Sequence, residues 1–326
     1  MLKSLIIVIL IGVGLYFISK YSNGCSYNPD LRIDNKVVIL TGGNTGIGKE
    51  TVKDLVKRGA KVYMGCRSLE KAQKAIDDIK KETGVSDDNV VLLHLDLTSL
   101  SSIREFVDEF KKREYQLDIL INNAGIMFAP YNITVDGFEQ TIASNYLGHF
   151  LLTHLLADIL LASAPSRIVT LSSLGHLFGT IDFDDFMGEK NKDWPFFHKG
   201  YAYPQSKLAN ILLAKELARR LDDTGVTSYA VHPGTVNTDL YRYSLPFQVA
   251  MFLASPFIKD TYHGARTSIY CAIEPGLEKN SGEYFSDCAA TQPSAEARDV
   301  NVAKRLWDMS IDLVKLQPDE IHPKLR

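Results

Sequence analysis

Residues 37–48 read VVILTGGNTGIG, and this stretch indicates the fold class. Its first four residues are apolar and form a candidate buried strand, and a helical pattern begins at Ile47. Glycines between a strand and a helix allow a tight turn close to a pyrophosphate group, and the helix N-terminus supplies free N–H groups and the positive end of its dipole. The glycine spacing is G-x-x-x-G-x-G rather than G-x-G-x-x-G. The prediction of a dinucleotide-binding loop therefore depends on the rest of the chain as well.

Beyond this loop, short apolar runs alternate with helical patterns. Apolar strands that alternate with helices predict a parallel sheet covered on both faces. We therefore expect a single α/β domain over residues 36–326, built on a doubly wound, Rossmann-type parallel sheet. The expected strands are 37–40, 62–65, 90–95, 117–121, 167–171, 226–231 and 282–285, and the expected helices cover 47–57, 69–81, 100–112, 138–161, 208–221 and 265–272.

Composition excludes several classes of protein. The chain has 326 residues, a formal net charge of −3 and 45% hydrophobic residues. These are ordinary globular values, and without a basic excess to neutralise phosphates we expect no nucleic-acid partner. The cysteines lie far apart, with no spacing typical of a zinc site. We therefore expect no metal and reduced thiols at Cys25, Cys66, Cys271 and Cys288.

The N-terminus carries an uncharged apolar segment. Residues 5–18 read LIIVILIGVGLYFI, which is fourteen residues. A bilayer span needs about 20 residues, with about 17 as a lower limit, and the flanking serines with snorkelling Lys3 and Lys20 reach that limit. We predict a membrane anchor or signal-anchor helix over residues 1–19 and a polar linker over residues 20–35. The alternatives are a cleaved signal peptide and a hydrophobic helix docked on the domain.

The end of the second predicted strand distinguishes between the two nicotinamide cofactors. An acidic residue there grips the ribose 2′-hydroxyl of NAD, whereas an arginine suits the 2′-phosphate of NADP. This strand ends in Gly65-Cys66-Arg67, which favours NADP(H), unless Arg67 is a solvated side chain at a helix start. Asp96 either accepts from adenine or caps the following helix. Residues 122–125, NNAG, permit close approach of a ribose, although Asn122 could equally brace two strands.

A tyrosine and a lysine four residues apart carry the predicted chemistry. On a helix this spacing places Tyr203 and Lys207 on one face. A lysine ammonium beside a phenol lowers its pKa and makes it a better general acid/base. The fifth strand ends in Ser172-Ser173, where a hydroxyl either holds a carbonyl oxygen opposite the tyrosine or simply terminates the strand. Asn145 lies inside a helical stretch, where asparagine is unfavourable, which predicts a helix distortion and a bound water.

Taken in chain order, these motifs resemble the short-chain dehydrogenase/reductase family over residues 36–310. Finer motifs resemble its membrane-bound, NADP-preferring retinol dehydrogenases: residues 41–51, 66–67, 145–150, 206–210, 232–236 and 285–288. Two features depart from the pattern. The stretch around residues 191–194 is longer than expected, and Pro204-Gln205 is an unusual pair inside the Tyr-x-x-x-Lys motif. We expect Pro204 in a first helical turn, where proline is tolerated.

The resemblance implies a role for each matching residue. Tyr203 would be the catalytic acid/base, and Lys207 would bind the nicotinamide ribose and lower the tyrosine pKa. Ser173 would hold the substrate carbonyl, and Asn145 would hold a water in a proton relay. The residues implied in binding NADP(H) are Gly42, Asn44, Thr45, Gly46, Ile47, Gly48, Arg67, Asp96, Leu97, Asn123, Ala124, Gly125, Tyr203, Lys207, Pro233, Gly234, Val236 and Thr238.

An apolar segment lies where that family carries a substrate lid, which we expect near residues 235–260. Residues 241–258 read YRYSLPFQVAMFLASPFI, which suits a long hydrophobic substrate, although the segment could instead pack on the domain or form a subunit contact. We therefore expect an NADPH-dependent enzyme that interconverts retinal and retinol or a similar lipophilic aldehyde and alcohol. The alternatives are a reductase for steroid or other hydrophobic carbonyls and a non-catalytic NADP-binding membrane scaffold.

The expected location is the endoplasmic reticulum membrane, with the catalytic domain facing the cytosol. Membrane attachment would run through the N-terminus. The resemblance also implies a homodimer formed through the helix that begins near Tyr203.

Overall fold

The strands assemble into one mostly parallel sheet. The computed structural model describes residues 14, 25, 27–191, 195–255 and 258–326. Within them, eight strands lie in the order β3-β2-β1-β4-β5-β6-β7-β8, and only the β7–β8 pair is antiparallel. The strands are β1 (Val37–Thr41), β2 (Lys61–Cys66), β3 (Val90–His94), β4 (Ile119–Asn122), β5 (Ser166–Leu171), β6 (Val226–His232), β7 (Tyr284–Ser286) and β8 (Ala289–Thr291).

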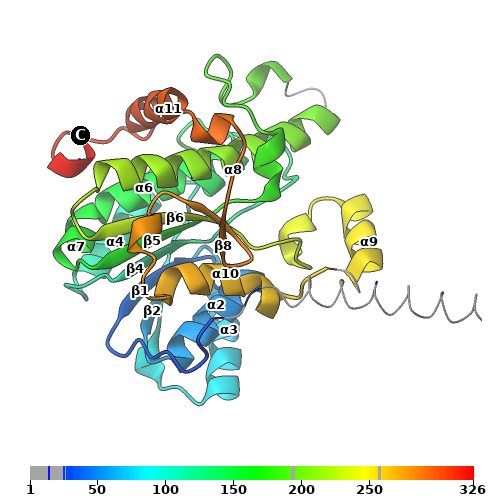
Figure 1. The fold of residues 1–326 in the computed structure, drawn as a ribbon. Coiled ribbons are helices and arrows are strands. Elements are labelled where there is room, and N and C mark those ends of the chain that lie inside the picture. The colour runs from blue at the N-terminus through cyan, green and yellow to red at the C-terminus, as the bar shows by residue number, and fades with distance from the viewer. Residues whose placement is uncertain (1–13, 15–24, 26, 192–194, 256–257) are drawn as a thin grey trace, which may run out of the picture.

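Helices cover both faces of the sheet, as the doubly wound prediction requires. One face carries α2, α3 and α10, and the other carries α4, α6 and α8 (Figure 1). The helices are α2 (Gly46–Lys57), α3 (Leu69–Thr83), α4 (Leu100–Lys111), α5 (Gln140–Ile142), α6 (Gly148–Leu155), α7 (Ala157–Ala162), α8 (Pro195–Arg220), α9 (Leu245–Ala254), α10 (Thr261–Ile273) and α11 (Val300–Leu313).

The apolar pattern of β1 explains why it lies at the centre of the sheet. Its residues are all buried, and they alternate between the two cores: Ile39 belongs to one, while Val38 and Leu40 belong to the other. From β1 the chain builds β2 and β3 on one side, and later β4, β5 and β6 on the other. The order therefore reverses between β1 and β4, and such a switch point opens a crevice at the carboxyl ends of the strands.

The predicted helix over residues 138–161 is interrupted where the asparagine argument places a distortion. Ala143–Leu147 forms a π-helical turn between α5 and α6, with Asn145 buried at its centre. The prediction for Pro204 is wrong. Helix α8 begins at Pro195, so Pro204 lies in its interior rather than in a first turn, and its missing N–H leaves one backbone hydrogen bond unmade.

The C-terminal helix α11, absent from the sequence prediction, packs on the α6/α8 face. The Trp307 ring lies 5.2 Å from the Phe150 ring, and the Arg220 guanidinium lies 4.4 Å from the Trp307 ring. The hydroxyls of Tyr146 and Ser310 are hydrogen bonded at 2.7 Å. Part of α8 is therefore covered by the chain itself.

The chain preceding β1 is held against the domain. The structure joins Cys25 to Cys288 in a disulfide, so the expectation of four reduced thiols is wrong for this pair. The partners lie 263 residues apart in sequence, a pairing that cysteine spacing does not reveal. Tyr27 donates to the Asp54 carboxylate at 2.9 Å. No helix among the described residues is long and apolar enough to cross a membrane, and the predicted anchor at residues 1–19 lies outside the described residues apart from Gly14.

Candidate active site

The crevice at the switch point holds most of the predicted site residues. A cavity of about 410 Å³ runs from the glycine loop after β1 to the buried tyrosine and lysine of α8. Its lining includes sixteen of the predicted residues: Gly42, Asn44, Thr45, Gly46, Ile47, Gly48, Arg67, Asp96, Leu97, Asn123, Ala124, Gly125, Tyr203, Lys207, Pro233 and Thr238. Four others, Ser173, Asn145, Gly234 and Val236, do not line it.

The glycine loop forms a cradle that side chains would fill. Gly42 and Gly46 have φ angles of +73° and +58°, which favour glycine. A Cβ at Gly48 would lie 2.2 Å from the Gly42 carbonyl oxygen, so that residue also has to be glycine. Thr45, the N-cap of α2, makes no side-chain capping bond, and the first turn of α2 holds no acidic residue. The N–H groups of that turn therefore suit an anion in the cavity.

A buried threonine and histidine brace this loop. The Thr41 hydroxyl accepts hydrogen bonds from the backbone N–H groups of Asn123 and Ala124, both at 3.0 Å. Its own proton therefore goes to Nε2 of His149, 2.8 Å away, and Nδ1 of His149 donates to the Asn145 carbonyl at 3.1 Å. Burial lowers the pKa of His149 to about 4, so the ring is neutral. No role was predicted for His149, although it lies in the motif at residues 145–150.

Two cations mark the corner of the cavity beside β2. Arg67 follows β2, and Lys71 lies in the first turn of α3; both are exposed and both line the cavity. Lys71 was not predicted, and its position one turn after Arg67 is the signal that would have found it. Asp96 does not cap α4, whose N-cap is Ser99. Instead Oδ1 of Asp96 accepts from the N–H and hydroxyl of Thr98, at 2.9 and 2.6 Å.

The asparagines after β4 have structural partners. Asn122 donates to the hydroxyl oxygens of Thr153 and Thr170, at 3.1 and 3.4 Å, so it is the strand brace that the sequence left open. The Asn123 side chain donates to the carbonyls of Thr41 and Gly42, at 2.8 and 3.1 Å. This pair of bonds ties β4 to the glycine loop.

The tyrosine and lysine lie together on α8, at the inner end of the cavity. Nζ of Lys207 lies 5.6 Å from the centroid of the Tyr203 ring and donates to the Leu171 carbonyl at 3.0 Å. Burial lowers the pKa of Lys207 to about 8. Burial also raises the pKa of Tyr203 to about 12, although a hydrogen bond with Ser173 opposes the rise. The structure therefore does not show the predicted lowering of the Tyr203 pKa by Lys207, because the cost of burying a phenolate is the larger effect.

The two serines after β5 point to different partners. The Ser172 hydroxyl donates to the Lys207 carbonyl at 2.7 Å, which holds the strand end against α8. The Ser173 hydroxyl forms a hydrogen bond with the Tyr203 hydroxyl and accepts another from the Gly175 N–H at 3.1 Å. A Cβ on Gly175 would lie 3.1 Å from Cε1 of Tyr203, so this glycine permits the close approach. Ser173 is thus the serine beside the phenol.

Asn145 connects the π-helical turn to the same centre. Its side chain accepts from the Ile126 N–H at 2.8 Å and donates to the Ile126 carbonyl at 3.0 Å and to the Ser206 hydroxyl at 3.0 Å. The remaining predicted residues lie at the β6 end, where a Cβ on Gly234 would meet Lys259 and where Val236 is buried against Gly264.

Aromatic rings surround the outer end of the site. The Phe247 ring of α9 lies 5.0 Å from the rings of both Phe128 and Tyr241. Tyr241 is near enough to raise the pKa of Tyr203 slightly, after the effect of burial. The approach to Tyr203 is therefore apolar and aromatic.

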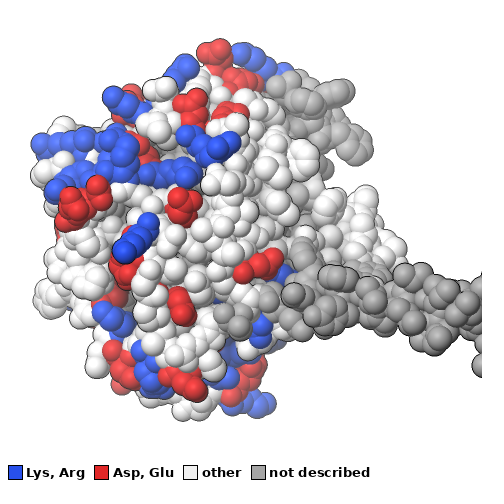
Figure 2. Space-filling view, in the orientation of Figure 1, with Lys and Arg blue, Asp and Glu red and all other residues white. Residues whose placement is uncertain are grey.

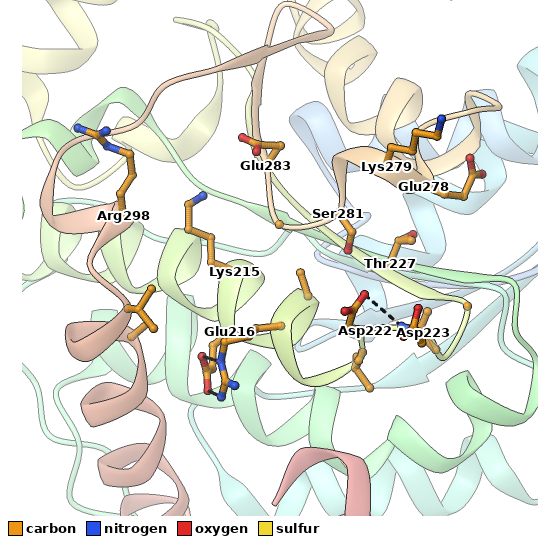
Figure 3. Close-up of a pocket in the computed structure, with 18 of the residues that line it drawn as sticks. Lys215, Glu216, Asp222, Asp223, Thr227, Glu278, Lys279, Ser281, Glu283 and Arg298 are labelled. Carbon is orange, nitrogen blue, oxygen red and sulfur yellow. Dashed lines mark hydrogen bonds and ion pairs between the residues drawn. The ribbon is translucent and has the colours of Figure 1, made fainter.

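A second cavity of about 680 Å³ lies elsewhere, at the amino end of β6. Figure 3 shows charged side chains of both signs around it, including Lys215, Glu283 and Arg298. Lys215 lies twelve residues after Tyr203 on α8, which is about 18 Å along a helix axis. This cavity holds none of the predicted site residues.

Comparison with known proteins agrees with this geometry. A family model described as short chain dehydrogenase matches residues 36–183. Retinol dehydrogenase 11 from Mus musculus is 51% identical over 298 residues, which is 91% of this chain and 92% of that protein. This chain belongs to the short-chain dehydrogenase family. Retinol dehydrogenase 12 from Bos taurus is 48% identical over 300 residues, covering 92% of this chain and 93% of that protein.

A solved structure has a similar architecture. The crystal structure of an uncharacterised protein from Mycobacterium paratuberculosis has a TM-score of 0.71 at 33% identity, and the match covers 90% of this chain and 98% of that one. Family membership identifies the chain as an oxidoreductase that acts on CH–OH groups.

Proposed function

We propose that this protein is an NADPH-dependent reductase/dehydrogenase that interconverts retinal and retinol, or a similar lipophilic aldehyde and alcohol. The observation that carries the proposal is the single cavity in which Tyr203 and Lys207 lie at one end and the glycine loop and Arg67 at the other. The similarity to retinol dehydrogenases 11 and 12 supports the substrate class.

The residues of the cavity fit a nicotinamide dinucleotide. The glycine loop and the first turn of α2 would hold the pyrophosphate, since the positive φ angles and the Gly48 contact leave room only for hydrogen at these positions. Arg67 and Lys71 would face the 2′-phosphate, and no carboxylate lines the cavity directly after β2. This charge pattern supports NADP(H) over NAD(H).

The bound nicotinamide would supply the hydride, and the protein would position the carbonyl and manage its proton. The Ser173 hydroxyl would donate a hydrogen bond to the carbonyl oxygen, which stabilises the negative charge that develops there. Tyr203 would then transfer its phenolic proton to that oxygen. Because burial raises the pKa of Tyr203 to about 12, the phenol is protonated near neutral pH and is ready to act as the acid in reduction.

The experiment that tests this function is NADPH oxidation by the detergent-solubilised protein. The carbonyls offered are all-trans-retinal, a steroid ketone and a medium-chain aldehyde, with NADH and the variant Tyr203→Phe as controls. We expect retinal turnover with NADPH that the variant loses. Turnover of the steroid alone would support the steroid alternative, and NADPH binding without turnover of any carbonyl would support the scaffold alternative.

We further propose that the enzyme resides at the endoplasmic reticulum membrane, with its domain facing the cytosol. Residues 132–134, NIT, form a glycosylation sequon whose Asn132 is exposed, so a lumenal domain would carry a glycan there. We expect no mobility shift on glycosidase treatment, and a shift would overturn this orientation. The Cys25–Cys288 disulfide favours the opposite face, because disulfides persist in oxidising compartments. A cytosolic domain therefore requires both thiols to react with maleimide in permeabilised cells.

A homodimer through α8 is also part of the proposal. Because α11 packs on α8, such a dimer would use the part of α8 that α11 leaves uncovered. Light scattering of the solubilised protein measures the mass directly, and a monomeric mass would remove the dimer from the proposal.

A further inference from the structure

Helix α9 has two apolar faces, only one of which packs on the protein. Its exposed face consists of Leu245, Val249, Phe252 and Leu253, with exposed fractions of 71%, 51%, 73% and 70%. These positions follow the spacing i, i+4, i+7, i+8, which places them on one side of a helix. The opposite side carries Met251, which is buried, and Phe247, which packs on the Phe128 ring while 38% of its surface stays exposed.

The exposed face of α9 is free of charge. Helix α9 contains no Lys, Arg, Asp or Glu, and its sequence is LPFQVAMFLA. Figure 2 shows uncoloured surface where Figure 1 places α9, whereas basic and acidic side chains gather on other parts of this view. A contiguous exposed apolar face marks a surface that contacts another protein, a membrane or a ligand.

The path of the N-terminal chain favours a membrane as the contact of this face. Cys25 lies beside Cys288, with 5.4 Å between their Cα atoms, and the Cys25 carbonyl accepts a hydrogen bond from Nη1 of Arg266 in α10 at 2.9 Å. Helix α10 begins at Thr261, seven residues after the last residue of α9. The uncharged apolar segment at residues 5–18 is thus joined to the domain beside α10, and six residues, 19–24, separate its end from Cys25. The seven Cα–Cα steps from residue 18 to Cys25 reach at most about 25 Å, so a bilayer that holds this segment lies close to α9.

Amphipathic aromatic side chains flank α9. Tyr243 precedes it with 40% of its surface exposed, and Tyr262 follows it with 47% exposed. The guanidiniums of Arg242 and Arg266 lie 5.0 and 4.9 Å from these two rings. Tyrosines paired with cations are the side chains that prefer the boundary between headgroups and hydrocarbon.

We propose that the exposed face of α9 inserts into the surface of a lipid bilayer, as a second membrane contact beside the N-terminal segment. The helix then lies in the plane of the interface, with its apolar face among the acyl chains. Its other face covers Phe128 and Tyr241 at the outer end of the site. A lipophilic carbonyl leaving the bilayer would therefore meet a continuous apolar path toward Tyr203. This route for the substrate rests on the proposed function, whereas the membrane contact does not.

The membrane contact is tested without turnover. The full chain carrying Phe252→Trp is reconstituted into phosphatidylcholine vesicles with and without bromine on the acyl chains, and tryptophan fluorescence is compared with that of the parent chain. The matched control is Tyr115→Trp, because Tyr115 is 89% exposed and precedes β4, at the opposite end of the strands. We expect brominated acyl chains to quench the added fluorescence at position 252 by at least half and that at position 115 by less than a tenth. Equal quenching at both positions would overturn the proposal.

The substrate route has its own test. Leu253→Glu places a charge on the exposed face of α9, and Val300→Glu places the same charge at an exposed position of α11. We expect Leu253→Glu to raise the KM for a vesicle-partitioned aldehyde at least tenfold and to leave the KM for a short water-soluble aldehyde unchanged, while Val300→Glu changes neither. An unchanged KM for the partitioned aldehyde, or an equal rise for both aldehydes, would overturn the route but leave the quenching result as the test of membrane contact.

Discussion

Replacing Arg67 with alanine is expected to separate the binding of NADPH from that of NADH. Arg67 is exposed, lines the cavity, and forms no hydrogen bond or ion pair with another described residue, so its removal should leave the fold intact. A hydrogen bond to a charged group contributes about 1.5–3 kcal/mol, and about 1.4 kcal/mol corresponds to a tenfold change in Kd. Arg67→Ala should therefore weaken NADPH about 10- to 150-fold and NADH by about twofold or less.

Equilibrium titration of nucleotide fluorescence with the solubilised full chain measures both Kd values. Arg113→Ala is the matched control, because Arg113 is an exposed arginine outside the cavity that pairs with Glu109. A salt series adds a second readout, since the variant should lose part of the salt dependence of NADPH binding. Equal weakening of NADPH and NADH, or an unchanged Kd for NADPH, would refute the assignment of Arg67 to the 2′-phosphate. Lys71 remains in the variant and should retain part of the NADPH preference.

Three further outcomes are expected. The kcat of alcohol oxidation should rise with pH over about pH 7–10, while the kcat of aldehyde reduction should not, because oxidation needs the phenolate of Tyr203 and burial raises the pKa of Tyr203 to about 12. A kcat that rises with pH for both oxidation and reduction would contradict this. Gly48→Ala should weaken NADPH binding at least about 100-fold, because the added Cβ would lie 2.2 Å from the backbone oxygen of Gly42, and titration within threefold of the parent would contradict it. Acid should destabilise the fold: burial lowers the pKa values of His149 and His154 to about 4, below the unfolded value of about 6.5, so the unfolded chain binds more protons between these values and the Tm should fall over that range. A Tm that stays constant from pH 7 to 5 would contradict the buried neutral rings.

Much of the fold could be predicted because the signals are local. A strand buried on both faces needs a continuous apolar run, as in Val37–Leu40, and an amphipathic helix needs a 3.6-residue period, as in Leu69–Lys81. The unfavourable asparagine at position 145 predicted a distortion, and a π-helical turn lies there. Helix α9 in the lid segment was harder to predict, because it is apolar on both sides and therefore has no clear period. Helix α11 was missed although its buried residues Ala303, Leu306, Trp307 and Ser310 follow a helical period.

The order of residues in the chain alone determined the alternation of strands and helices, the glycine loop, and the pairing of Tyr203 with Lys207, because each depends on neighbours within a few residues. Only the tertiary structure decided that Ser173 rather than Ser172 is hydrogen bonded to Tyr203, and that the Thr41 hydroxyl donates to His149, 108 residues away in the chain. It also decided the Cys25–Cys288 bond and which face of α9 stays exposed. These features depend on how the whole chain packs, since a buried polar group takes its partner from whatever element the fold brings beside it.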